Sequence, residues 1–99
     1  MSRPLIVRAK AEADIESAFK WYEEQRPGLG ADFIRSVDTA LASVQREPEL
    51  YQLVYRNARR VVLHSFPYAV FYIIQGEAAE VVACMHFRRN PRRWQARVR

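Results

Sequence analysis

The sequence predicts a two-layer α+β domain, in which an antiparallel pair of helices covers one face of a mainly antiparallel sheet. The prediction depends on a change of period along the chain. Apolar side chains recur with helical spacing over residues 14–46, whereas residues 51–87 form short β-branched and aromatic runs separated by turns. A chain of 99 residues suits one core, so we expect a single domain over residues 1–99.

The first half begins with a β-prone run, Pro4–Arg8, which we expect to form a strand. A helix is predicted next from apolar residues at i, i+3, i+4 and i+7: Ile15, Ala18, Phe19 and Tyr22. It is expected to end at Arg26-Pro27-Gly28, because proline disfavours helix in the residue before it and glycine suits a turn. The carboxylates of this helix are interpreted as solvent-facing: Asp14, Glu16, Glu23 and Glu24.

A second helix is predicted from about Gly30 to Arg46, and Pro48 ends it. Its apolar stripe consists of Phe33, Val37, Ala40, Leu41 and Val44. Only a few residues separate the two helices, which favours an antiparallel hairpin.

The second half is expected to be a β-meander followed by a short C-terminal helical turn. Its predicted strands are Tyr51–Tyr55, Arg59–Leu63, Tyr68–Ile74 and Glu80–Phe87. Strict alternation along the last strand places Val82, Cys84 and His86 on one face. In the tail, Asn90–Arg99, we expect Asn90 to cap a basic helical turn, Pro91 to open it, and Trp94 to pack against the domain.

Positive charge is concentrated in the second half of the chain. Residues 1–49 carry seven basic and nine acidic side chains, a net charge of −2, whereas residues 50–99 carry nine arginines and two glutamates, a net charge of +7. Arginine grips phosphate or carboxylate with a planar fork of donors. The pattern therefore favours a basic surface that meets an anionic or acidic partner, and its plain alternative is a solvated basic face.

Several classes of site have no support in the sequence. Two histidines and the single Cys84 fit no zinc pattern, so no metal is expected. Gly28-Leu29-Gly30 lacks the Lys and Ser/Thr of a phosphate-binding loop, and no cofactor is expected. Arg3, Arg8 and Lys10 interrupt the only apolar run that could act as a signal peptide, and no stretch has the length of a membrane span. We therefore expect a cytoplasmic protein with no membrane partner.

The remaining candidates for chemistry are a histidine and arginines at strand ends. Metal-free RNA cleavage needs a general acid or base, which His86 could supply, and cations on the phosphate. Arg60, Arg88 and Arg89 are the candidate phosphate-binding groups. The alternative is that His86 is a structural hydrogen-bonding group and the arginines form a solvated rim.

Three segments together resemble the RelE/ParE-type toxins of bacterial type II toxin–antitoxin modules. The quoted segments are Trp21–Gly30 with Phe33, then Arg60 with Phe66-Pro67-Tyr68 and Phe71-Tyr72, then His86–Pro91 with Trp94. They cover nearly the whole chain in the family's order and spacing. The resemblance implies a RelE/ParE-like fold and a cognate antitoxin that neutralises the toxin.

The resemblance also implies two possible targets. RelE-like members cut mRNA on the ribosome, often with a tyrosine near the C-terminus, whereas ParE-like members poison DNA gyrase. The absence of a tyrosine after Tyr72 and the helix-hairpin segment favour the ParE-like branch. Ribosome-dependent mRNA cleavage and an inactive relative that only binds antitoxin stay as alternatives, so the sequence leaves open whether the chain is an enzyme. The predicted antitoxin- or target-binding residues are Arg59, Arg60, Arg89, Arg92, Arg93 and Trp94.

Overall fold

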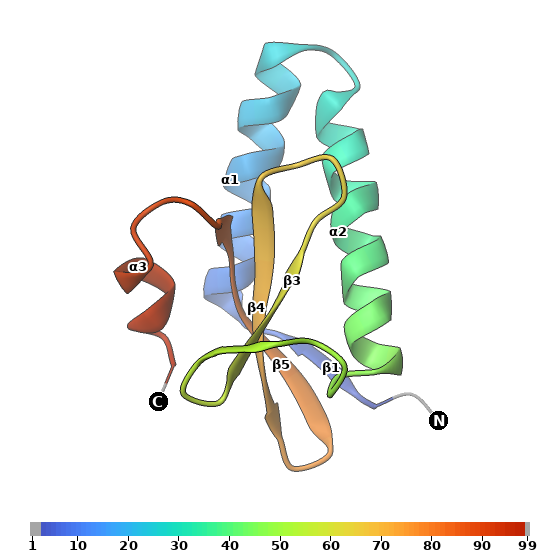
Figure 1. Ribbon diagram of the computed structural model, residues 1–99. Coiled ribbons are helices and arrows are strands. Elements are labelled where there is room, and N and C mark those ends of the chain that lie inside the picture. The colour runs from blue at the N-terminus through green and yellow to red at the C-terminus, as the bar shows by residue number, and fades with distance from the viewer. Residues whose placement is uncertain (1–2, 99) are drawn as a thin grey trace.

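The computed structural model describes residues 3–98 and confirms the predicted α+β architecture (Figure 1). Two long helices lie on one face of a five-stranded sheet, and a short helix lies on the other face. The elements are β1 (Leu5–Val7), α1 (Ala9–Gln25), α2 (Leu29–Arg46), β2 (Leu53–Tyr55), β3 (Ala58–Val62), β4 (Tyr68–Gln75), β5 (Ala78–His86) and α3 (Arg92–Gln95).

The strand order is β1-β5-β4-β3-β2, and strands β2 to β5 form the predicted antiparallel meander. β1 pairs in parallel with β5, from Leu5 opposite Ala79 to Val7 opposite Val81. The predicted and observed strand boundaries differ by one or two residues: β2 begins at Leu53 and not at Tyr51, and β5 begins at Ala78 and not at Glu80. α1 begins at Ala9, several residues before the periodic apolar positions that predicted it. Within residues 3–98, no helix is both long and apolar enough to cross a membrane.

The sheet separates two apolar clusters. The larger one fills the space between the helical hairpin and the sheet and includes Phe33, Val37, Val44, Val70 and Tyr72. The smaller one lies under α3 and includes Phe71, Ile73, Val82, Ala83, Trp94 and Val98. Trp94 stacks on Phe71 with 4.1 Å between ring centroids, which confirms that the tail packs against the domain. Arg99, the last residue of the predicted tail, lies outside the described residues.

The tight corner between α1 and α2 depends on Glu23. Its carboxylate accepts hydrogen bonds from the backbone N–H groups of Gly28 and Gly30. The shortest distance from each nitrogen to a carboxylate oxygen is 3.0 Å. These are the free donors at the N-terminus of α2, where a negative charge also favours the helix dipole. Gly28 has φ +91°, and a Cβ at Gly30 would lie 2.8 Å from Glu23 Oε1. The interpretation of Glu23 as solvent-facing is therefore wrong.

We predict that Glu23→Ala lowers the free energy of unfolding by about 1–2 kcal/mol, because α2 loses the acceptor for two N–H groups. The matched control is Glu24→Ala, which removes an exposed carboxylate one residue away and should change stability by less than about 0.5 kcal/mol. Denaturant unfolding followed by circular dichroism measures both. Equal stabilities for the two variants would contradict the role of Glu23.

A β-bulge at Val82 changes the face on which the later residues of β5 lie. Phe71 is opposite Ala83 and Tyr72 is opposite Val81, which leaves Val82 without a partner on β4. Val81 and Cys84 consequently lie on the helix side, whereas Val82 and Ala83 lie on the α3 side. The predicted shared face of Val82, Cys84 and His86 is therefore wrong for Val82, because the inserted residue interrupts the alternation.

The bulge lies where β5 loses its neighbour β1. The last backbone contact on this edge runs from the Arg8 N–H to the Val81 carbonyl. Beyond it, the Arg97 guanidinium donates to the Val82 carbonyl at 3.0 Å, and the Asp14 carboxylate accepts from the Cys84 N–H at 3.0 Å.

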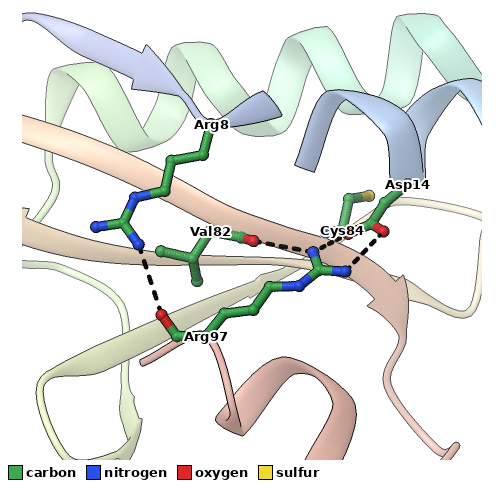
Figure 2. Close-up of polar contacts among 5 residues, drawn as sticks. All are labelled: Arg8, Asp14, Val82, Cys84 and Arg97. Carbon is green, nitrogen blue, oxygen red and sulfur yellow. Dashed lines mark hydrogen bonds and ion pairs between the residues drawn. The ribbon is translucent and has the colours of Figure 1, made fainter. Parts of the chain in front are cut away.

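Asp14 and Arg97 also form an ion pair at 2.6 Å, so the two side chains together continue the edge of the sheet (Figure 2). The Arg8 guanidinium reaches the same place through the Arg97 carbonyl. The interpretation of Asp14 as solvent-facing is wrong, because its side chain is only 13% exposed and has two partners.

We predict that Asp14→Ala lowers the free energy of unfolding by about 3 kcal/mol, because it leaves the Arg97 guanidinium without its counter-charge in a mostly buried site. Glu49→Ala is the control. It breaks the exposed ion pair with Arg3, which should contribute less than about 1 kcal/mol. Chemical denaturation compares them, and a loss for Asp14→Ala no larger than that for Glu49→Ala would contradict the prediction.

Candidate functional site

A pocket of about 420 Å³ lies between the middle of α1 and the C-terminal end of β5. Residues of α1, the start of β4, the end of β5 and the segment leading into α3 line it. We call it the His86 pocket. Its polar and aromatic side chains are Asp14, Ser17, Trp21, Tyr22, Tyr68, His86, Arg89, Asn90 and Arg93. Its size is within the range of ligand-binding clefts.

His86 lies on the helix side of the sheet, opposite Tyr68 on β4. Its Nδ1 accepts a hydrogen bond from the Arg88 N–H at 3.2 Å, which fixes the neutral ring with its proton on Nε2. Partial burial lowers the pKa of His86 from its ordinary value of 6.5, and the charges of Arg89 and Arg88 lower it further. At neutral pH the pocket therefore holds an imidazole that donates through Nε2 and carries no charge.

Aromatic side chains form the α1 wall and floor of the pocket. Burial raises the pKa of both Tyr22 and Tyr68, while Arg89 opposes the shift, so both hydroxyls stay protonated and can donate hydrogen bonds at neutral pH. Trp21 is 53% exposed and meets Tyr22 edge to face at 5.0 Å. The ring is thus available to a partner, whereas Tyr22 also packs on Phe33 in the core.

Arg89 and Arg93 supply the positive charge of the pocket. Both residues are exposed, and neither forms an ion pair with any residue of the described part of the chain, 3–98. The single carboxylate that lines the pocket, Asp14, is already paired with Arg97. The pocket therefore combines unpaired cations with neutral donors, which is an arrangement suited to an anionic group.

The other predicted site residues lie elsewhere. Arg60 is opposite Phe71 and so lies on the α3 side of the sheet, away from His86. The Arg88 guanidinium lies over the Phe87 ring, 5.6 Å from its centroid, and Phe87 packs with the α3-side cluster. The structure therefore brings His86 and Arg89 together and does not bring Arg60 to them.

Two predicted binding residues have structural contacts. Arg59 donates to the carbonyls of Glu49 and Tyr51, which holds the segment before β2. Trp94 is 6% exposed, so it fixes α3 and presents almost no surface of its own. Arg92 is exposed on α3, where its N–H binds Asn90 Oδ1 as expected for a capped turn, although α3 begins at Arg92 and not at Pro91.

Sequence reasoning missed the aromatic part of the pocket. Tyr22 was expected only on the apolar stripe of the first helix, and Trp21 and Tyr68 only as part of the family resemblance, yet all three line the pocket. Cys84 is buried, and burial together with nearby Asp14 raises its pKa to about 12, so its thiol is not a nucleophile at neutral pH. Among residues 3–98, no three metal-ligating side chains cluster.

Residues of α1 and α2, together with Val7 of β1, line a second hollow. Its apolar residues are Val7, Ile15, Phe19, Ile34, Val37 and Leu41, and its charged residues are Glu12, Glu16 and Asp38. It contains none of the predicted site residues. Its lining is mainly apolar, and its charged groups are all acidic, so it complements cations and not the anions that the His86 pocket suits.

Comparisons with known proteins agree with this architecture. The model of a family described as the ParE toxin of type II toxin-antitoxin system, parDE, matches residues 5–91. The toxin ParE2 of two strains of Mycobacterium tuberculosis is 26% identical over 99 residues, which covers 99% of this chain and 94% of the relative. The chain therefore belongs to the ParE toxin family of type II toxin–antitoxin systems.

Solved structures show the same fold. A chain of a chromosomal ParDE TA system from P. aeruginosa superposes with a TM-score of 0.73 at 15% identity, over 86% of this chain and 96% of that one. A chain of the toxin-antitoxin complex RelBE2 from Mycobacterium tuberculosis superposes with a TM-score of 0.58 at 14% identity, over 87% and 99%. The RelE/ParE-type fold predicted from the three sequence segments is thus confirmed.

We predict that a proton NMR titration of the His86 ring gives a pKa below 6.5, and that Arg89→Ala moves this pKa upward. Because His86 keeps its ordinary pKa of 6.5 in the unfolded chain, the unfolded chain takes up this proton at a higher pH than the folded chain does. The free energy of unfolding therefore decreases as the pH falls from 6.5 to the pKa of the folded state, and His86 causes no further loss below that pH. A pKa that Arg89→Ala leaves unchanged would show that Arg89 does not face the ring.

Proposed function

We propose that this chain is held inactive by a cognate antitoxin and, once released, arrests growth by binding a target protein such as DNA gyrase. The observation that carries the proposal is the match of the ParE toxin family over residues 5–91. The two structural neighbours come from toxin–antitoxin systems, which supports an antitoxin as partner. The unpaired arginines of the second half provide a surface on which acidic partners bind favourably.

The positions of the candidate nuclease groups favour binding over RNA cleavage. Cleavage requires a general acid or base and phosphate-binding cations to converge on one phosphate. Here Arg89 shares the pocket with His86, but Arg60 lies on the opposite face of the sheet and the Arg88 guanidinium lies over Phe87. Only part of the candidate set therefore converges. Tyr68 and Tyr22 stand near His86, but burial raises the pKa of each and so makes it a poor base at neutral pH.

We predict that expression of the chain alone arrests growth and that co-expression of the product of the neighbouring reading frame restores it. Purified toxin added to gyrase and relaxed plasmid should inhibit supercoiling at a toxin concentration similar to that of the enzyme. Primer extension on cellular mRNA, made soon after induction, should show no new cleavage sites.

The growth, supercoiling and primer-extension measurements together distinguish the alternatives. New mRNA cuts with normal supercoiling would overturn gyrase binding in favour of ribosome-dependent cleavage. Unchanged growth of cells that accumulate folded chain would identify an inactive relative. Failure to recover any complex with the neighbouring product would contradict the antitoxin part of the proposal.

A further inference from the structure

The His86 pocket contains hydrogen-bond donors that no acceptor of the described chain uses. The hydroxyls of Tyr22 and Tyr68 line the pocket, and neither donates to another group of residues 3–98. His86 adds a third donor, because its Nδ1 accepts from the Arg88 N–H and leaves the ring proton on Nε2. Within the same residues, a side-chain nitrogen or oxygen that has no partner is never fully buried, so the three donors are open to solvent.

The polar acceptors of the pocket already have partners. The Asp14 carboxylate accepts from the Arg97 guanidinium and from the Cys84 N–H. The side-chain oxygen of Asn90 accepts from the Arg92 N–H. Among the residues that the structure describes, the pocket therefore has no free carboxylate, and a ligand has to bring the acceptor atoms itself.

The positive charge of the pocket lies beside these free donors. Burial raises the pKa of Tyr22 and Tyr68 and lowers that of His86, and the charge of Arg89 acts on all three groups. The Arg89 guanidinium is therefore close to the three donors, and Arg93 lines the same pocket. This arrangement suits a group with several charged oxygens. A phosphate monoester has three free oxygens and a charge of about −1.5 to −2 at pH 7.

Trp21 gives the pocket a second kind of contact. Its side chain lines the pocket and is 53% exposed, so ring surface is free for a ligand. Nucleic-acid bases of every type stack on such rings, because each base has a π-face. The pocket volume of about 420 Å³ is that of a small-molecule site and exceeds what a phosphate group alone would fill. A phosphate joined to a planar base uses both the donors and the ring.

We propose that the His86 pocket is a binding site for a free nucleoside 5′-monophosphate. The phosphate accepts from Tyr22, Tyr68 and His86 beside the charge of Arg89, and the base stacks on Trp21. An acidic protein side chain, with two oxygens and no ring, would leave part of the donors and Trp21 unused. The inference goes beyond the proposed function, because this site requires neither an antitoxin nor gyrase.

The site is tested by NMR titration of the purified full chain with adenosine 5′-monophosphate. The Trp21 indole and His86 ring signals should shift together and give one dissociation constant. The indole of Trp94 is the internal reference, because it is 6% exposed and stacks on Phe71 away from the pocket. Adenosine and inorganic phosphate should each bind at least about tenfold more weakly, since each lacks one of the two contacts.

Variants test the two contacts separately, with binding followed on the His86 ring signals. Arg89→Gln should weaken adenosine 5′-monophosphate by about tenfold or more, because the phosphate loses a charged donor. Arg92→Gln is the matched control at an exposed position outside the pocket lining, and it should change affinity by less than about threefold. Trp21→Leu should weaken the nucleotide by about tenfold and leave the affinity for inorganic phosphate unchanged, whereas Trp21→Phe keeps a ring for stacking. Thermal melting checks that each variant folds.

The contrary outcomes are distinct. Shifts that spread over the exposed arginines and persist in the Arg89→Gln variant would indicate unspecific ion pairing and overturn the inference. Equal affinities for the nucleotide and for inorganic phosphate would also overturn it, and so would binding of a 5′-phosphorylated oligonucleotide by a chain that ignores the mononucleotide. A chain that binds no nucleotide but arrests growth overturns this inference alone. A chain that binds the nucleotide without arresting growth contradicts only the proposed function.

Discussion

The Asp14–Arg97 ion pair holds the part of the molecule on which the rest of the site depends. β1 is only three residues long and leaves the outer edge of β5 uncovered at the bulge. Asp14 belongs to α1, on one face of the sheet, and Arg97 follows α3, on the other face. Their ion pair therefore connects the elements on both faces to the edge of the sheet. The Val82 carbonyl at the bulge and the Cys84 N–H beyond the end of β1 gain partners in this way.

The arrangement also explains why a strongly basic chain does not assemble its arginines into one cluster. Arg97 is used by the sheet edge, Arg59 by the carbonyls before β2 and Arg8 by Glu80. The arginines left unpaired, such as Arg89 and Arg93, are those whose positions leave them facing solvent and the pocket. Net charge is therefore a poor guide to the working surface, since several arginines of the basic excess have structural roles.

The elements of the fold could be predicted from the sequence because their signals are local. Periodicity located α1 and α2, and β-branched runs located β4 and β5. The bulge could not be predicted, because no residue type at Val82 distinguishes an unpaired position from a paired one. The roles of Asp14 and Arg97 were missed for another reason: they are 83 residues apart, and only the folded sheet edge brings them together. For Glu23 the sequence does contain a local sign, the glycines at positions 28 and 30. Their role, which is to bring two backbone N–H groups to the Glu23 carboxylate, is visible only in the folded hairpin.

The bulge has a consequence for how this surface can change over time. Relative to Ala79 and Val81, the single unpaired residue reverses the face of everything after it on β5. Because of this bulge, His86 lies on the helix side of the sheet and lines the same pocket as Trp21. Without it, His86 would lie on the α3 side, the face that carries Arg60. Substitutions can only adjust the lining of the present pocket. Deletion of one residue at the bulge would instead move every later side chain of β5 to the opposite face of the sheet. A single deletion therefore gives the same fold a different set of residues on its binding surface.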